Sequence, residues 1–363
     1  MFATNKKILV LEPYYGGSHK SFLQGLREHL EFEFEFLTLP ARNWKWRMRL
    51  AAPYFVEQLR KIEQDRDSYQ CILCSTFVDV ASLIGLAPSM FVDIPVLTYF
   101  HENQFAYPVQ IEMERDFHFA LTNFTTALAS DRLAFNSSYN LESFLDGCRD
   151  LLKKSTDMKV DDFEGQIRAK SRIIHPGIDF SDLTGKPEPA HDGEAPIIVW
   201  NHRWEHDKNP ELFFNALFEL DRREVNFQLV VLGQSFRDQP VIFQQAQKRL
   251  ADHIIHFGYV KSRDEYVRWL KKSDLVVSTA NHEFYGISVI EAVGAGCRPL
   301  LPKRLSYPEL FPEEFFYEDS SLADEMTLAL KKGRLDSQRA RGLTERFSWT
   351  NLINDYTSWL VSS

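Results

Sequence analysis

Apolar and polar positions along the chain predict a series of alternating strands and helices. Residues 6–13, KKILVLEP, contain a nearly continuous apolar run, which is typical of a strand covered on both faces. Residues 32–40 alternate between apolar and polar side chains, as a half-buried strand does. The same criteria predict helices over residues 19–30, 52–64, 116–130 and 139–152, and strands over 71–76, 94–103, 131–138 and 171–179. Repeated β–α units of this kind indicate a parallel, doubly wound sheet.

A second series of units begins after a polar break. Residues 179–196 contain three prolines and two glycines without an apolar period, which is typical of an interdomain linker. Beyond it the pattern predicts strands at 197–203, 227–233, 254–260, 274–279 and 298–302, with helices at 210–222, 239–252, 264–273 and 286–296. We therefore predict two Rossmann-like α/β domains, residues 1–184 and 185–342, which face each other across a cleft.

The tail of the chain, residues 337–363, reads as a long amphipathic helical stretch. Trp349, Tyr356 and Trp359 recur at helical spacing within it. We expect residues 343–363 to return to the first domain and to complete it, with these aromatic side chains packed against its surface.

Most of the unusual polar segments follow predicted strands. In open parallel sheets, ligands bind outside the carboxyl ends of the strands. The segments at those ends are EPYYGGSH, STFVD, YFHENQ, NHRWEHDK, LGQSFR and STANHEFYG. Their shared position indicates a ligand site built from several strand ends.

Composition narrows the class of protein. Of the 363 residues, 44% are hydrophobic and 26% charged, as in ordinary soluble proteins, and the net charge of −9 does not favour a general nucleic-acid binder. No apolar run approaches the ~18 residues of a membrane-spanning helix, and the apolar run at the start is too short for a signal peptide. Four cysteines without framework spacing favour a reducing cytoplasm.

Cys71 and Cys74 have the C-x-x-C spacing of a metal or redox site. They lie within a predicted strand, where residues three apart point to opposite faces, and no second pair of cysteines completes a site. We therefore expect two buried strand cysteines and no metal.

Two cations in the second domain suggest an anion site. Arg203 and Lys208 lie between a predicted strand and the next helix. Cations beside a helix N-terminus suit a diphosphate, because charge and free amides both favour anions there. The alternative is a pair of ordinary surface cations on a loop.

The segment NHEFYGISVIE, residues 281–291, places two carboxylates around a predicted helix start. Glu283 lies in a loop and Glu291 lies within the following helix. Carboxylates accept hydrogen bonds from the vicinal hydroxyls of sugars. We expect Glu283 to hold a hexose, Glu291 to hold a ribose, and the amides near Gly286 to meet a phosphate. The whole segment would then bind a nucleotide-sugar donor, with contacts from Phe284, Tyr285, Gly286, Ile287 and Ser288.

Glu283 to Glu291 is similar to the E-x7-E signature of retaining GT-B glycosyltransferases, and Arg203 with Lys208 resembles their pyrophosphate clamp. Five segments of the first domain, in order, resemble the tRNA-queuosine α-mannosyltransferases: EPYYGGSHKSF, LPARNWKWRMR, STFVDVASLIGL, YFHENQFAYPVQ and FNSSYNLESFL. This resemblance implies the GT-B fold and transfer of mannose from GDP-mannose to the cyclopentenediol of queuosine in tRNA(Asp), with retention. Arg203, Lys208, Glu283 and His101 are the candidate catalytic residues.

No cofactor or metal is expected beyond GDP-mannose as co-substrate. The Arg203/Lys208 clamp would neutralise the departing diphosphate without a metal, and we find no D-x-D-type motif at a suitable strand end. Gly16 and Gly17 lie in the first β–α turn, where their backbone could approach the donor, but they do not form the G-x-G-x-x-G of dinucleotide enzymes.

The remaining polar residues of the first domain are candidate acceptor contacts. His101 ends a predicted strand and should face the anomeric region of the donor; a capped structural histidine is the alternative. We expect acceptor contacts from Tyr14, Tyr15, Ser18, His19, Glu102, Asn103 and Gln104, although plain turn chemistry also explains those of the first turn. With tRNA as the acceptor, Arg42 and Arg47 would bind phosphates and Trp44 would stack on an unpaired base; the alternative is a solvated loop or helix start.

Three other functions fit parts of the sequence. A GT-B enzyme acting on a lipid or polysaccharide would need a basic amphipathic helix on the first domain, for which the sequence offers no clear candidate. A nucleotide-sugar epimerase would need acid and base carboxylates, for which Glu102, Glu112 and Glu114 are available. A non-catalytic nucleotide-sugar or tRNA-binding protein would not need the combined set of Arg203, Lys208, Glu283 and Glu291.

Overall fold

The computed structural model describes residues 7–61, 67–107, 116–155, 157–184, 195–234 and 240–361. The chain forms two compact units. The first unit comprises residues 1–177 together with 349–363, and the second comprises residues 178–348. Glu112 and Glu114, the further carboxylates considered for an epimerase, lie outside the described residues.

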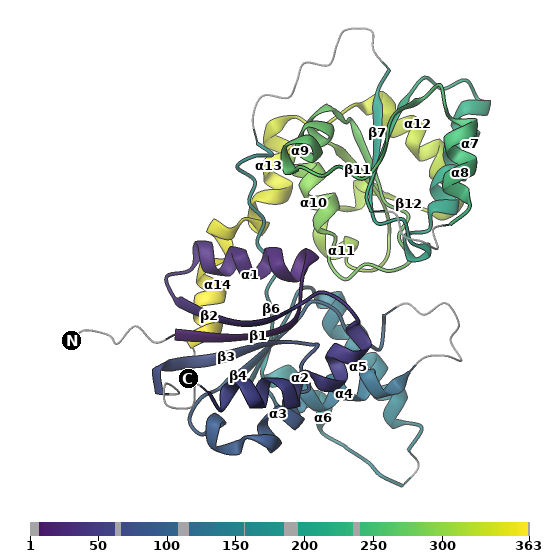
Figure 1. Ribbon diagram of the computed structural model, residues 1–363. Coiled ribbons are helices and arrows are strands. Elements are labelled where there is room, and N and C mark those ends of the chain that lie inside the picture. The colour runs from purple at the N-terminus through teal and green to yellow at the C-terminus, as the bar shows by residue number, and fades with distance from the viewer. Residues whose placement is uncertain are drawn as a thin grey trace. The chain divides into compact units, whose positions relative to one another are not determined.

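The first unit contains a six-stranded parallel sheet in the order β2-β1-β3-β4-β5-β6. Its strands are β1 (Lys7–Tyr15), β2 (Glu33–Pro40), β3 (Tyr69–Ser75), β4 (Val96–Phe100), β5 (Arg132–Phe135) and β6 (Ser171–Ile173). Its helices are α1 (Gly17–His29), α2 (Trp44–Leu59), α3 (Val80–Leu86), α4 (Phe117–Ala129), α5 (Ser138–Leu152), α6 (Phe163–Ala169) and α14 (Trp349–Val361). Helices α1 and α14 cover one face of the sheet, and α2 and α3 cover the other (Figure 1).

The cysteines of β3 follow the expected strand geometry. Cys71 packs with α1 and α14 on one face of the sheet, whereas Cys74 packs with α2 and α3 on the other. Both thiols are buried and free, because neighbouring side chains cover β3 on both faces. The structure confirms buried strand cysteines on opposite faces.

The last helix, α14, contributes its aromatic side chains to the core of the first unit. Trp349, Tyr356 and Trp359 are buried with Phe22 and Leu26 of α1. The Tyr356 hydroxyl donates to the His175 carbonyl at 2.7 Å. Helix α14 therefore completes the layer of helices on one face of the first sheet.

The second unit contains another six-stranded parallel sheet, in the order β12-β11-β10-β7-β8-β9. Its strands are β7 (Ile197–Asn201), β8 (Gln228–Leu232), β9 (Ile254–Gly258), β10 (Leu275–Val277), β11 (Arg298–Pro302) and β12 (Phe316–Tyr317). Its helices are α7 (Pro210–Arg222), α8 (Ile242–Arg249), α9 (Arg263–Lys272), α10 (Ile287–Gly294), α11 (Tyr307–Leu310), α12 (Leu322–Lys332) and α13 (Ser337–Thr344).

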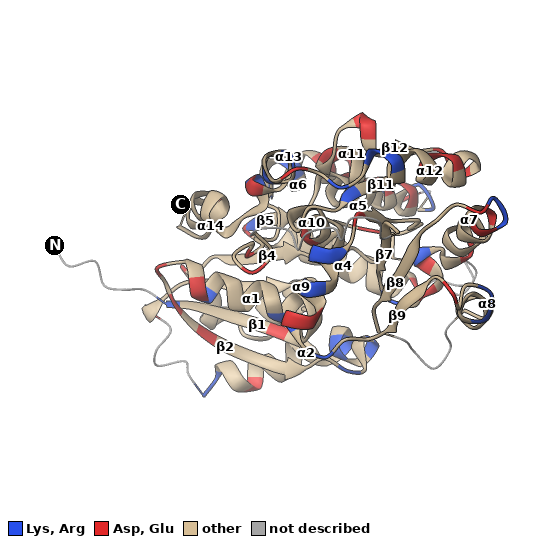
Figure 2. Ribbon diagram, turned by 90° about the horizontal axis from the view of Figure 1, so that it is seen from above, with Lys and Arg blue, Asp and Glu red and all other residues tan. Residues whose placement is uncertain are grey.

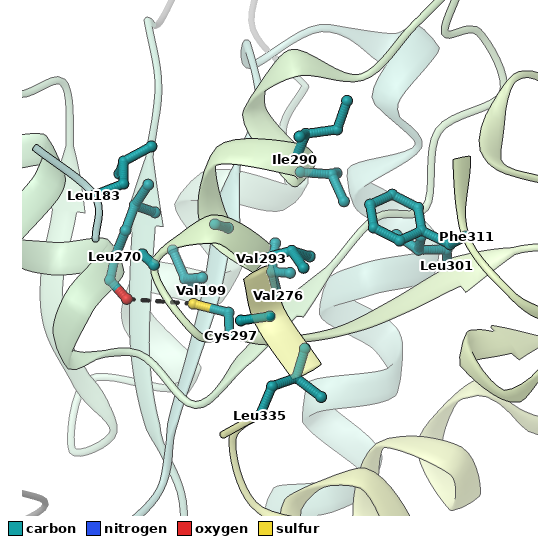
Figure 3. Packing of buried hydrophobic residues seen from close by; sticks show 14 of the residues in the cluster. Leu183, Val199, Leu270, Val276, Ile290, Val293, Cys297, Leu301, Phe311 and Leu335 are labelled. Atoms are coloured by element: carbon teal, nitrogen blue, oxygen red, sulfur yellow. Dashed lines mark hydrogen bonds between the residues drawn. The ribbon is translucent and has the colours of Figure 1, made fainter. Parts of the chain in front are cut away.

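Two apolar layers sandwich the second sheet. Helices α9, α10 and α13 pack on one face, and α7, α8 and α12 pack on the other. Figure 3 shows the first of these layers, where Val199 of β7, Val276 of β10 and Val293 of α10 converge. The Cys297 thiol lies in the same layer and donates to the Leu270 carbonyl at 3.3 Å.

The structure places the ends of the two units differently from the predicted residues 184 and 343. Ile178 and Leu183 already pack in the apolar layer of the second unit. Ile178 also forms a β-bridge with Ser348, and its amide donates to the Phe347 carbonyl at 2.9 Å. These contacts keep residues 178–184 and 343–348 with the second sheet.

Several elements differ from the sequence prediction. Helix α2 begins at Trp44 rather than at residue 52, because its buried positions continue back to Met48 at helical spacing. The predicted long helix of the tail is divided into α13 and α14, since Ser348 is extended and pairs with Ile178. Helices α3, α6, α11 and α12 and the short strand β12 were not predicted. Among the described residues, no helix combines the length and apolar character that crossing a bilayer requires.

Candidate functional site

A short loop after β7 carries the first group of candidate residues. Residues His206–Lys208 form one 3-10 turn, which is tied to the segment after β10. The Thr279 hydroxyl donates to the Lys208 carbonyl at 2.8 Å, and the Asn281 amide donates to the Asp207 carbonyl at 2.8 Å. Two strand-end segments far apart in sequence are therefore held together at the carboxyl edge of the second sheet.

Lys208, which is buried, and Glu283, which is partly buried, form an ion pair at this edge. The Lys208 ammonium donates to the His282 carbonyl at 2.6 Å and to Glu283 Oε2 at 3.3 Å. It also lies 3.3 Å from Asp207 Oδ2, although without hydrogen-bond geometry. Burial alone would raise the pKa of Glu283. The charge of Lys208 and several smaller contributions together outweigh burial and hold that pKa below its ordinary value. The smaller contributions come from His202, His282 and the Tyr285 amide. Glu283 is therefore an anion at neutral pH.

Arg203 differs from Lys208 in its surroundings. Its side chain is half exposed, and it pairs with Glu205 at 3.0 Å. Burial lowers the pKa of His202 to about 4, with Lys208 adding to the effect. The same causes lower the pKa of His282 to about 4. The positive charge of this loop at neutral pH therefore comes from Arg203 and Lys208 and not from these histidines.

Helix α10 begins next to Glu283. Gly286 precedes the helix with φ of 109°, a left-handed conformation that side chains rarely adopt, and a Cβ there would lie 3.2 Å from the Tyr307 ring. No side chain of the described residues caps this helix start, and its first turn carries no acidic residue. The positive end of the helix is thus open to an anion.

The other candidates of this segment have mixed surroundings. Tyr285 is buried in the apolar layer with Phe347, and Phe284 packs against the His282 ring. Ile287 is partly buried against the same layer. The Ser288 carbonyl accepts a hydrogen bond from the side-chain amide of Asn201 at 2.7 Å. Phe284 and Tyr285 therefore have packing roles in the second unit.

Glu291 is held by residues that the sequence analysis missed. Arg263 Nη1 donates to its Oε1 at 2.5 Å, and the Tyr266 hydroxyl donates to its Oε2 at 3.0 Å. Burial raises the pKa of Glu291, and Arg263 opposes that shift. Arg263 also pairs with Asp182 at 2.8 Å. Arg263 and Tyr266 are one helical turn apart on α9, a spacing that could have indicated a shared target.

A second group of titratable residues lies at the carboxyl edge of the first sheet. His19 Nδ1 lies 2.9 Å from Glu12 Oε2, and its Nε2 lies 3.4 Å from Glu102 Oε2. Burial would lower the pKa of His19, but the two carboxylates outweigh it and raise the pKa to about 10. His19 is therefore an imidazolium that donates from both ring nitrogens. Glu12 was not among the predicted residues, because a single acid at a strand end carries no distinctive spacing.

His101 packs directly against this imidazolium. The two ring centroids are 4.2 Å apart, and Phe22 and Tyr99 surround the His101 ring further. Burial and the charge of His19 lower the pKa of His101 well below its ordinary value. The two histidines therefore carry different charges at neutral pH: His19 is protonated and His101 is neutral.

The structure distributes the remaining first-unit candidates between buried and exposed positions. Asn103 is fully buried; its amide nitrogen donates to Asn140 Oδ1 at 2.9 Å and its oxygen accepts from the Ala106 amide at 2.9 Å. This side chain fixes the loop, as does the Gln104 amide, which donates to Asn123. Tyr14 stacks on Phe77 with centroids 5.1 Å apart. Tyr15 and Gly16 are partly buried, whereas Gly17 and Ser18 are exposed at the start of α1.

The basic–aromatic segment forms the start of α2. Arg42 is exposed just before the helix, and Arg47 donates to the Pro40 carbonyl at 3.4 Å. Trp44 is partly buried, with its ring centroid 5.2 Å from that of Phe119. The residues described here contain no group of three or more His, Cys, Asp or Glu side chains arranged to hold a metal ion.

Comparisons with known proteins identify the family. Residues 7–178 match the family model described as tRNA-queuosine alpha-mannosyltransferase N-terminal, and residues 184–343 match that of glycosyl transferases group 1. A Drosophila melanogaster protein described as tRNA-queuosine alpha-mannosyltransferase is 36% identical over 329 residues, covering 88% of this chain and 86% of the relative. The chain belongs to the tRNA-queuosine α-mannosyltransferase family. It is a hexosyltransferase.

Solved structures agree with the fold of this family member. Sucrose-phosphate synthase from Thermosynechococcus elongatus superposes with a TM-score of 0.71 at 15% identity, covering 97% of this chain and 98% of that one. Anabaena Alr3699/HepE in complex with UDP superposes with a TM-score of 0.67 at 14% identity, covering 98% and 100%. At such identities the likeness concerns the fold alone. The predicted GT-B fold is confirmed.

Proposed function

We propose that this chain transfers mannose from GDP-mannose to the cyclopentenediol of queuosine in tRNA(Asp), with retention of anomeric configuration and without a metal ion. The relative's description and the two family matches support the reaction class and the acceptor. The structural observation that carries the proposal is the largely buried Lys208–Glu283 pair beside the open start of α10. Four buried free thiols fit a reducing cytoplasm as the place of action.

The second unit would bind the donor through opposite charges. The diphosphate gains negative charge as the sugar leaves, and Arg203, Lys208 and the positive end of α10 would stabilise that charge. A site with two cations and a helix start supplies the electrostatic role that a divalent metal has in other transferases. This is the physical basis for proposing a metal-independent reaction.

The two glutamates would orient the two sugars of the donor. Glu283 accepts from Lys208 and from the Tyr285 amide, and a carboxylate has further lone pairs for hexose hydroxyls. Glu291 would accept from the ribose while Arg263 and Tyr266 hold it in place. Both carboxylates are thus pre-oriented by protein groups before any ligand binds.

The neutral state of His101 suits a transition state with positive charge on the sugar. A glycosyl group develops oxocarbenium character as its leaving group departs. A neutral imidazole can hydrogen-bond a sugar hydroxyl without repelling that charge, whereas an imidazolium would oppose it. We propose this role for His101, and we propose that Glu102 contacts the tRNA acceptor.

The test is a product analysis with the full chain. Purified protein is incubated with queuosine-containing tRNA(Asp) and GDP-mannose, and the nucleosides are analysed by mass spectrometry. We expect a hexose on queuosine, its formation in the presence of EDTA, and an α-anomeric signal by NMR. The matched controls are tRNA(Asp) without queuosine and a set of UDP-sugars. Transfer from a UDP-sugar and not from GDP-mannose would refute the assignment of the donor. Loss of transfer in EDTA that is restored by added metal would refute metal independence.

A further inference from the structure

Helix α2 presents an apolar face to solvent. Trp46, Leu50 and Tyr54 follow one another every four residues, and 65%, 52% and 41% of their surfaces are exposed. The opposite side of the helix is buried through Met48, Ala51, Ala52, Phe55, Val56 and Leu59. Leaving an apolar row in water on a helix that already has a full buried face is unfavourable. Such a row is typical of a binding surface.

Cations surround the beginning of this face. Arg42, Lys45, Arg47 and Arg49 occur before the first acidic residue of the helix, Glu57. On α7 and α12, by contrast, the two signs are mixed (Figure 2). The chain as a whole carries −9. A polyanion would be repelled by much of the surface, so its binding requires a local concentration of cations such as this one.

The position of these cations on the helix is electrostatically unfavourable without an anion. Lys45 lies in the first turn of α2, at the positive end of the helix dipole, and that turn carries no acidic residue. The helix dipole disfavours a cation at this position. Arg49 pairs with Asp116 at 2.9 Å, whereas the buried Nε of Arg47 has no hydrogen-bond partner among the described residues. A phosphate at the helix start would relieve the repulsion.

The two tryptophans of the segment have different environments. Trp44 packs on Phe119, and the Lys45 ammonium lies 5.7 Å from the centroid of the Trp44 ring. Trp46 is the most exposed of the large apolar side chains on α2. Stacking on an unpaired base requires an accessible ring face. Trp46, and not the predicted Trp44, meets this requirement.

We propose that the α2 face, formed by Trp46, Leu50 and Tyr54 with Arg42, Lys45 and Arg49, binds the phosphate backbone and an unpaired base of the acceptor RNA, with Trp46 as the stacking residue. The identity of the RNA as tRNA rests on the proposed function; the surface and its chemistry do not. An anionic membrane is the competing partner for a basic helix with exposed apolar residues. The exposed apolar row has only three residues, however, which offer little apolar area for insertion into a bilayer, and this favours RNA.

The experiment measures binding of unmodified tRNA(Asp) transcript to the full chain over a range of salt concentrations. We expect Trp46→Ala to weaken binding about tenfold to a hundredfold with an unchanged salt slope. Arg42→Ala and Lys45→Ala should each flatten the slope of log K against log salt by roughly 0.7–0.9. The matched controls are Tyr259→Ala, an equally exposed aromatic of the second unit, and Lys331→Ala on α12. GDP affinity should remain that of the wild type in every variant.

Two outcomes would contradict the assignment of the α2 face. Wild-type tRNA binding by all three α2 variants overturns the proposal. So does binding to vesicles with anionic lipid that depends on Trp46 while tRNA binding does not. Because the transcript lacks queuosine and no sugar is transferred, failure of the mannosyl-transfer proposal leaves this result standing. Conversely, unchanged tRNA binding beside normal sugar transfer refutes only the α2 face.

Discussion

At the residue scale, Arg203 and Lys208 carry the same charge in different surroundings, and this difference sets what a substitution does. Lys208 is buried against Glu283, so its removal would leave a partly buried carboxylate without its main cation. Arg203 is half exposed, and its removal should not disturb folding. Arg203 is therefore the cleaner probe of the diphosphate clamp.

We expect Arg203→Ala to lower kcat/KM for GDP-mannose by an amount equivalent to on the order of 3 kcal/mol, because it removes charge stabilisation of the departing diphosphate. Steady-state kinetics with saturating tRNA measures this. Lys303→Ala, which removes an exposed cation of the same unit, is the matched control. Turnover by Arg203→Ala within about threefold of the wild type would contradict the clamp.

Substitutions of Glu283 and Glu291 should have different effects on GDP binding and on turnover. Glu283→Gln keeps the shape but loses the charge that meets Lys208 and a hexose hydroxyl, so kcat/KM should fall strongly. Glu291→Gln should mainly weaken GDP binding, since Arg263 and Tyr266 would no longer hold an anion toward the ribose. Calorimetric titration with GDP distinguishes them. Equal losses of GDP affinity in both variants would refute the division.

The charge of His19 predicts a pH-dependent stability. Its folded pKa, about 10, exceeds the ordinary value of 6.5, because Glu12 and Glu102 stabilise the imidazolium beside the neutral His101. The resulting stabilisation is complete below pH 6.5 and is lost as the pH rises through 10. The difference in Tm between wild type and His19→Gln should therefore shrink over that range. The exposed His118→Gln is the control, and a pH-independent difference would argue against the ion pairs.

At the element scale, the junction of α1 and α14 depends on a close approach of backbone to an aromatic ring. A Cβ on Gly25 would lie 2.1 Å from the Trp349 indole, and one on Gly177 would lie 2.3 Å from it. The His29 ring stacks on the same indole. Glycine within α1 thus serves packing against α14, at the expense of helix propensity.

Gly25→Ala should destabilise the first unit by about 1–3 kcal/mol, although alanine normally favours a helix. Gly85→Ala in α3, where a Cβ meets nothing within 4 Å, should be neutral or stabilising and is the matched control. Thermal unfolding measures both. The cost should be smaller in a Trp349→Ala background, because the clash is absent there. Equal effects at Gly25 and Gly85 would show that α14 does not pack as described.

At the scale of the whole molecule, the chain leaves the first unit at Gly177 and returns to it at Trp349. Deleting residues 349–363 removes Trp349, Tyr356 and Trp359 from the core of the first unit and exposes their apolar partners. We expect the truncated protein to precipitate or unfold, as judged by its recovery in the soluble fraction and its circular dichroism. Val361→Ala, on an exposed position of α14, should behave as wild type. A soluble, active truncation would refute this role of the tail.

Much of the fold could be predicted from local patterns, for a physical reason. Parallel strands buried on both faces need continuous apolar runs, and this requirement makes β1, β4 and β7 visible in the sequence. The proposed site residues Arg203, Lys208, Glu283 and Glu291 could likewise be selected from the sequence, because they follow predicted strands or lie around a predicted helix start. Local periodicity and local spacing are properties of a single segment, so one sequence suffices to reveal them.

Only the tertiary structure decided which segments meet. The order β2-β1-β3-β4 brings Glu12 and Glu102 to one histidine, although no periodicity relates the ends of β1 and β4. Packing on Phe119 separates Trp44 from the exposed Trp46, two residues with the same local signal. Likewise, the bridge between Ile178 and Ser348 divides a tail whose apolar spacing reads as one helix. These outcomes depend on contacts between distant segments, whose energies no local pattern contains.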